Sequence, residues 1–186
     1  MISFGTDGWR AIIADTFTFD NVRIVTQAIA NYLIAQKLGT GGSEPRAQSP
    51  ERMVVVGYDN RFMAEEFADV VTSVLAANGI GVVLSTQPTP TATVAFAVKS
   101  LKTKGALMLT ASHNPSYYNG IKFIPSYAGP ATKEITGRIE EEIKKVEESR
   151  RVSYLSRSEA QSSPLINKTD ITRDYIAGIK NLVDFG

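Results

Sequence analysis

Between residues 53 and 109, short apolar runs alternate with segments of helical periodicity, and this alternation restricts the possible folds more than any other feature. The run at 53–57 is β-branched and free of polar side chains, which is typical of strands inside parallel sheets. Two further runs at 80–84 and 106–109 are separated from it, and from each other, by helical patterns at 64–78 and 91–99. The alternation predicts an α/β fold: a layered mixed, largely parallel sheet flanked by helices.

The segments around this region extend the pattern. Thr18 or Asp20 can cap a predicted helix whose apolar residues continue to Leu33. Residues 120–124 are typical of a short strand that returns from the loop before it, and residues 132–148 predict an amphipathic helix. These elements belong to the same main domain.

The composition changes after this helix. Residues 149–168 are polar and serine-rich, and a new helical pattern with an apolar stripe starts near Asp170. Such a stripe needs a surface to pack on. We therefore expect one main domain over 1–150, followed over 151–186 by a linker and the first helix of a truncated second domain.

The overall composition excludes several classes of protein. Among the 186 residues, 43% are hydrophobic and 21% charged, and no apolar run approaches the roughly 18 residues of a membrane span. The net charge of +1 provides no long-range field for nucleic acid. The N-terminus lacks the features of a signal peptide, and there is no cysteine for disulfides. We expect a cytoplasmic protein that binds neither membrane nor nucleic acid.

Residues 39–52 are rich in glycine, serine and proline and predict an exposed, mobile loop. A phosphate-binding loop would need a lysine after its glycines and a strand before them, and both are missing. A flexible connection is therefore favoured over a ligand site.

The most informative short motif runs from Thr110 to Pro115 and has Ser112 near its centre. It follows the apolar run at 106–109, so the serine is expected at the carboxyl end of a strand, where open α/β sheets build their sites. A serine hydrolase is disfavoured, because neighbours on an extended segment point in opposite directions and His113 is the only histidine. A serine hydroxyl in this place could instead carry a phosphoryl group.

Phosphoryl transfer needs cations to neutralise the phosphate oxygens and an acid or base for the hydroxyl groups. Lys122, ten residues after Ser112, could return to the base of the loop as a point charge or proton shuttle. Arg10 offers a planar fork that suits phosphate. Taken alone, however, an isolated lysine or arginine is usually a solvated surface residue, and a Ser-His-Asn-Pro segment is usually a turn.

Four motifs in order decide between these interpretations. They are the segments 4–10 (FGTDGWR), 57–61 (GYDNR), 88–91 (PTPT) and 110–115 (TASHNP), and the similarity continues through 118–123 (YNGIKF). In these segments the chain resembles domain I of the α-D-phosphohexomutases, the phosphoglucomutase/phosphomannomutase family. The resemblance runs from about residue 2 to residue 148.

The resemblance implies that Ser112 is a phosphoserine in an isomerase of the intramolecular phosphotransferase type. Such enzymes interconvert hexose 1-phosphate and hexose 6-phosphate through a hexose 1,6-bisphosphate. It further implies that Lys122 is a general acid or base, that Arg10 lies at the active site, and that His113 and Asn114 shape the pocket.

By position, Asp59 and Arg61 match a family motif near the loop, where an ion pair and a direct catalytic contact are equally expected. The phosphoserine would give one oxygen to Mg²⁺. The other metal ligands and the sugar contacts would come from domains two to four of the same polypeptide, so this chain alone is expected to be inactive. The loop departs from many relatives at Ser116 and Tyr117, where they have a proline and an acidic residue.

Two alternatives belong to other functional classes. The chain could be a stand-alone, non-catalytic phosphosugar-binding module, or a scaffold domain in which Ser112 is only a turn residue.

Overall fold

The computed structural model describes residues 2–5, 8–36, 49 and 52–182. The loop predicted for residues 39–52 lies outside them, apart from Ser49 and Arg52. In chain order, the elements are β1 (Trp9–Ile12), α1 (Phe19–Ala35), β2 (Met53–Tyr58), α2 (Ala64–Ala77), β3 (Gly81–Ser85), α3 (Thr91–Ser100), β4 (Gly105–Leu109), β5 (Tyr118–Pro125), α4 (Lys133–Ser149), α5 (Arg157–Ser162), β6 (Ile166–Thr169) and α6 (Thr172–Lys180).

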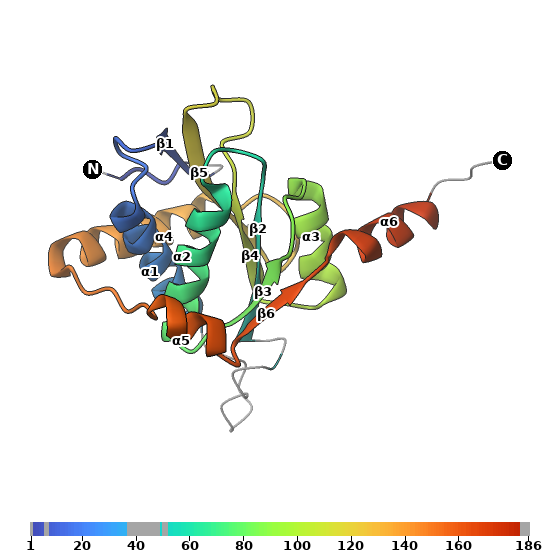
Figure 1. Cartoon of the computed structure of the whole chain (residues 1–186). Helices are drawn as coiled ribbons and strands as arrows, with labels where there is room; N and C mark the ends of the chain where they lie inside the picture. Colours follow the sequence, from blue (N-terminus) through green and yellow to red (C-terminus); the bar gives the residue numbers. More distant parts are fainter. Residues whose placement is uncertain (1, 6–7, 37–48, 50–51, 183–186) are drawn as a thin grey trace.

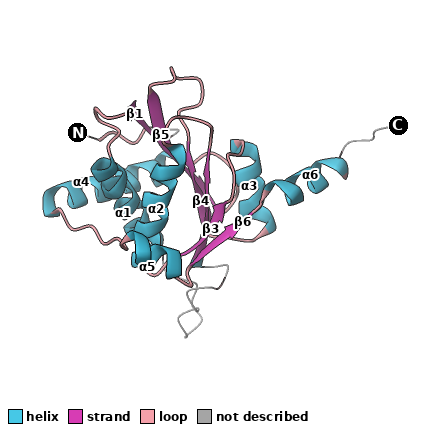
Figure 2. Ribbon diagram, in the orientation of Figure 1, coloured by secondary structure: helices cyan, strands magenta, loops and turns pink. Residues whose placement is uncertain are grey.

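The strands form one six-stranded sheet in the order β1-β5-β4-β2-β3-β6 (Figures 1 and 2). Strands β2, β3, β4 and β6 are parallel, whereas β5 is antiparallel to both β4 and β1. The β4–β5 connection is the serine motif itself, which is short enough to join only antiparallel neighbours. The predicted layered and largely parallel sheet is confirmed.

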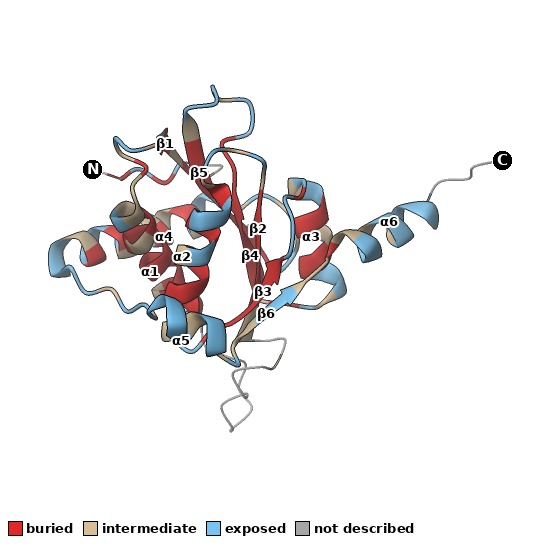
Figure 3. Ribbon diagram, in the orientation of Figure 1, coloured by how far each residue is buried: buried red, intermediate tan, exposed pale blue. Residues whose placement is uncertain are grey.

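Both faces of the central strands are covered, as their unbroken apolar sequences require. Val54 and Val56 pack into a core with α1, α2 and α4, and Val55 between them packs with α3 on the opposite face. All three are completely buried (Figure 3). Successive residues of a strand alternate between the two faces, so the sheet separates two apolar layers.

Side chains at the helix starts confirm two predicted caps. The Thr18 hydroxyl accepts a hydrogen bond from the backbone N–H of Asn21, so Thr18 and not Asp20 caps α1. Thr132 caps α4 in the same way, through the N–H of Ile135. Each cap satisfies an N–H group that the helix itself leaves without a partner.

The serine-rich segment after α4 contains two elements that the sequence did not predict. Ser156 and Glu159 form a reciprocal capping box at α5. Strand β6 then pairs in parallel with β3 and forms an edge of the sheet. The next helix, α6, lies against α3. The rings of Tyr175 on α6 and Phe96 on α3 pack edge to face, with 5.7 Å between the ring centroids. The domain boundary near residue 150 stays a prediction.

Candidate functional site

The loops after β2 and β4 leave the sheet side by side, because these two strands are parallel neighbours. The N–H of Asp59 donates to the carbonyl of Leu109 at 3.1 Å and extends the strand pairing into the loops. Tyr58, the last residue of β2, is 4% exposed, and burial raises its pKa above the ordinary value for tyrosine. The loops therefore start from a rigid, apolar base.

Ser112 is exposed and lies in a tight turn with a φ of 51°. Its N–H donates to the Thr110 hydroxyl at 2.9 Å, and the N–H of Asn114 donates to the Ala111 carbonyl at 3.0 Å. A non-glycine residue in this left-handed region costs roughly 1–3 kcal/mol and tends to occur at functional sites. The expected extended conformation at Ser112 and His113 is therefore wrong, because hydrogen bonds within the loop curl the chain.

Arg10 reaches the serine from β1. Its Nη2 lies 3.4 Å from Ser112 Oγ, and its Nη1 donates to Asn114 Oδ1 at 3.1 Å. Arg10 is paired with Gly120 on β5, and a Cβ atom at Gly120 would lie only 3.0 Å from Arg10 Cγ. The missing side chain at Gly120 leaves space for the arginine stem, so the structure brings Arg10, Ser112 and Asn114 together as the sequence suggested.

Lys122 follows on the same face of the sheet. It lies on β5 two residues after Gly120, the partner of Arg10, and two residues share a face at this spacing. Its own partner on β4 is Met108. Lys122 is partly buried and His113 is exposed. Arg10 and Lys122 thus extend from adjacent strands on the face that also carries α3.

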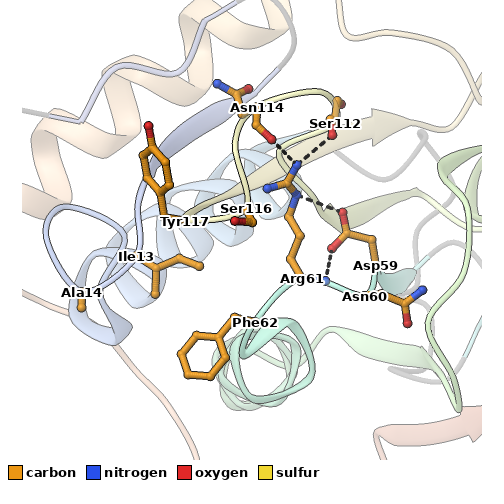
Figure 4. A pocket seen from close by; sticks show the side chains of 10 residues that line it. All are labelled: Ile13, Ala14, Asp59, Asn60, Arg61, Phe62, Ser112, Asn114, Ser116 and Tyr117. Carbon is orange, nitrogen blue, oxygen red and sulfur yellow. Dashed lines mark hydrogen bonds and ion pairs between the residues drawn. The ribbon is translucent and has the colours of Figure 1, made fainter.

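Arg61 donates hydrogen bonds to several groups of the loop region. Its Nη1 and Nη2 atoms donate to four backbone carbonyl oxygens, those of Pro115 (2.8 Å), Tyr118 (2.9 Å), Ser112 (2.8 Å) and Asn114 (2.7 Å). Its Nε lies 3.4 Å from Asp59 Oδ2, and its backbone N–H donates to Asp59 Oδ1 at 3.0 Å. Figure 4 shows the guanidinium group between the serine loop and Asp59. Of the two expected roles for this pair, the geometry favours the ion pair.

An open cleft of about 800 Å³ lies beside the loop, with Asp59, Arg61, Ser112 and Asn114 among its lining residues. Apolar and aromatic side chains also line the cleft, among them Ile13, Phe62 and Tyr117 (Figure 4). The sequence motifs did not indicate these side chains. Phe62 is 70% exposed and Tyr117 is 56% exposed, so both rings face the open cleft or solvent.

The described residues do not form a metal centre by themselves. No group of three or more histidine, aspartate or glutamate side chains gathers within this part of the chain. The carboxylate of Asp59, in the loop after β2, is held by Arg61. Ser112 could contribute one oxygen to a metal once phosphorylated, and further ligands would have to come from elsewhere. None of the described helices has the length and apolar content to span a bilayer.

The chain resembles known proteins in both sequence and structure. Residues 1–150 match the family model for "Phosphoglucomutase/phosphomannomutase, alpha/beta/alpha domain I". The chain is 29% identical to a phosphoglucomutase of Staphylococcus saprophyticus over 203 aligned positions, which cover 98% of this chain and 32% of that protein. A phosphoglucomutase of Staphylococcus aureus strain MRSA252 is 27% identical, with 99% and 32% covered. The chain thus spans about a third of the length of these relatives.

Solved structures agree. A protein of Thermus thermophilus described as a phosphomannomutase superposes with a TM-score of 0.79 and 33% identity, over 98% of this chain and 36% of that one. Parafusin from Paramecium, with a TM-score of 0.77, 20% identity and coverage of 98% and 35%, supports the fold alone. The match of 1–150 decides the classification: the chain belongs to the phosphoglucomutase/phosphomannomutase family and contains its N-terminal α/β domain I.

Proposed function

We propose that this chain provides the phosphoryl-carrying serine of a phosphohexomutase that interconverts hexose 1-phosphate and hexose 6-phosphate. The observation that carries the proposal is the exposed Ser112 hydroxyl in a left-handed turn, 3.4 Å from Arg10, at the carboxyl end of β4. A strained, exposed nucleophile beside a cation suits phosphoryl transfer, which depends on positioning and charge neutralisation.

The reaction consists of two phosphoryl transfers. In the first, a hydroxyl oxygen of the hexose phosphate forms a bond to phosphorus and gives its proton to a base, while the bond from phosphorus to Ser112 Oγ breaks and Oγ takes up a proton. The product is a hexose 1,6-bisphosphate. In the second, Ser112 Oγ gives up its proton and forms a bond to the other phosphorus atom, the bond from that phosphorus to the sugar oxygen breaks, and the sugar oxygen regains a proton. The serine ends the cycle phosphorylated, as it began.

Arg10, Lys122 and Asn114 assist Ser112 in this proposal. His113 shapes the pocket. Arg10 neutralises charge on the phosphoryl group, for which its planar fork is suited. Lys122 moves the proton to and from the sugar hydroxyl, because an ammonium group can lose a proton whereas a guanidinium group does not. Asn114 also shapes the pocket and orients Arg10 through its side-chain oxygen.

Mg²⁺ is the proposed metal, and the phosphate on Ser112 would supply one of its oxygen ligands. When bound, the ion would neutralise charge on the transferring group. The residues described do not complete its coordination. The other ligands, together with the sugar contacts, are assigned to the further domains that relatives about three times as long possess. The proposed partners of this chain are therefore a hexose phosphate, a hexose 1,6-bisphosphate and the other domains of its polypeptide. The proposed location of the protein is the cytoplasm.

The proposal is tested with the longer protein that contains this chain, phosphorylated beforehand with glucose 1,6-bisphosphate. We expect it to exchange phosphate between the 1 and 6 positions of glucose or mannose phosphates, and we expect the 186-residue chain alone to show no turnover. Binding of the sugar phosphates without any exchange would identify a binding module instead. If the protein neither binds the sugar phosphates nor exchanges their phosphate, the result would favour a scaffold domain.

Replacing Lys122 by methionine is expected to lower kcat about 10²- to 10⁴-fold, the usual contribution of a general acid or base. Lys122→Arg keeps the charge but cannot release the proton, so it should restore little of the rate. Steady-state kinetics on the longer protein measure both variants. If Lys122→Arg were nearly as active as the parent, the lysine would act only as a charge.

A further inference from the structure

The four Nη hydrogens of Arg61 are all used within the protein. The guanidinium group carries five N–H bonds. Four of them donate to loop carbonyls at 2.7 to 2.9 Å, and Nε, which carries the fifth, lies 3.4 Å from Asp59 Oδ2 in an ion pair. The side chain is also only 13% exposed. A phosphate group could approach Arg61 only by displacing contacts that hold the serine loop.

The arrangement of acceptors explains why an arginine is needed here. Four carbonyl oxygens of the 112–118 segment converge on one guanidinium group, and their negative ends would repel each other without a cation between them. A planar fork can satisfy all four at once, whereas a lysine ammonium has only three donors on a single atom. Asp59, two residues earlier in the same loop, fixes the orientation of the fork.

We propose that Arg61, oriented by Asp59, is a positioning residue that holds Ser112 in its left-handed conformation before and after phosphoryl transfer. The inference rests on the proposed function of Ser112. Arg61 binds the backbone carbonyl of Ser112 and not its hydroxyl, so addition of phosphate to the hydroxyl oxygen does not remove the acceptor of this hydrogen bond. Arg10, by contrast, contacts the hydroxyl itself. The two arginines therefore have different roles. Arg61 holds the backbone of the loop, and Arg10 neutralises charge on the phosphoryl group.

The first experiment measures hydrogen exchange in the 186-residue chain. The N–H groups of Ser112, Asn114 and Tyr118 are bonded within the loop, so their exchange reports its opening. In Arg61→Met we expect these amides to exchange at least about ten-fold faster, as a locally opened segment does, while those of β2 and β4 keep their protection. Asp59→Asn keeps the shape of the carboxylate and should give a smaller change in the same amides.

The second experiment measures kcat and KM in the longer protein. A misplaced nucleophile costs about 100-fold in rate, so Arg61→Met should lower kcat by this factor with KM for the hexose phosphate nearly unchanged. Arg61→Lys should recover only part of the rate. The matched control is Arg138→Met, which removes an exposed arginine from an ion pair with Glu134 on α4 and should change neither constant.

Two results would overturn the proposal. One is a raised KM with unchanged kcat in Arg61→Met, which would make Arg61 a direct substrate ligand. The other is unchanged loop exchange together with a normal kcat. If Arg61→Met does not fold, Asp59→Asn decides between the same outcomes. If the parent protein shows no mutase activity, the proposed function fails, and the exchange experiment still tests whether Arg61 holds the loop.

Discussion

Ser112→Ala is expected to abolish phosphohexomutase activity in the longer protein, with a loss of at least about 10³-fold in kcat. The alanine has no oxygen to accept or donate a phosphoryl group, and the removal of a nucleophile typically costs this much or more. The fold should be unaffected, because the side chain is exposed and its oxygen bonds only to Arg10 among the hydrogen bonds described. A coupled assay measures the activity, and thermal unfolding measures the stability.

The matched control for this variant is Ser126→Ala. Ser126 is also an exposed serine, but it follows β5 at the far end from the serine loop. Its removal should leave both activity and melting temperature unchanged. A Ser112→Ala protein that still exchanged phosphate at more than about a tenth of the parent rate would disprove the assigned role of the serine.

Gly120→Ala should strongly destabilise the sheet beside the site. The new Cβ would lie 2.6 Å from the Thr110 carbonyl oxygen and 2.7 Å from that of Trp9. Both are backbone atoms of the segments on either side of β5, so neither can move without breaking the sheet pairing. Overpacking of this kind costs roughly 1–3 kcal/mol or more. Chemical denaturation of the 186-residue chain measures the change in the free energy of unfolding.

Gly137→Ala is the control with the opposite expected sign. Gly137 lies inside α4, and a Cβ added there meets no heavy atom within 4 Å. Alanine is favoured over glycine in a helix interior by about 1 kcal/mol, so this variant should be more stable than the parent. Equal and small effects of the two substitutions would contradict the close approach of the strands at Gly120. A further loss of activity in Gly120→Ala is expected, because Arg10 would be displaced.

The sheet was predictable because its central strands are buried on both faces. Runs such as 53–57 have no polar residue, and only a parallel strand between helical layers explains them together with the helices that follow. Strand β6 has no such signal. Its sequence, Ile-Asn-Lys-Thr, is polar in the middle, and it forms only because β3 offers an unpaired edge. Pairing between segments so far apart in the chain cannot be derived from local periodicity.

The motifs name three residues that the structure places in contact, Ser112, Arg10 and Asn114, but the conformation of the loop was not predictable. The left-handed turn at Ser112 depends on carbonyl contacts from Arg61, which is 51 residues earlier in the chain. One signal was present in the sequence: Gly120 begins the predicted strand at 120–124, and a glycine in a strand often marks a close backbone approach.

The most direct test of the central claim is to locate the transferred phosphoryl group. The unphosphorylated longer protein is mixed with glucose 1,6-bisphosphate labelled in its phosphates, quenched at short times and digested for mass spectrometry. We predict that the label appears on Ser112 and is passed to unlabelled glucose 1-phosphate or glucose 6-phosphate added afterwards. Label on any other residue, or exchange between sugars without label on the protein, would contradict the role of Ser112 as the phosphoryl carrier.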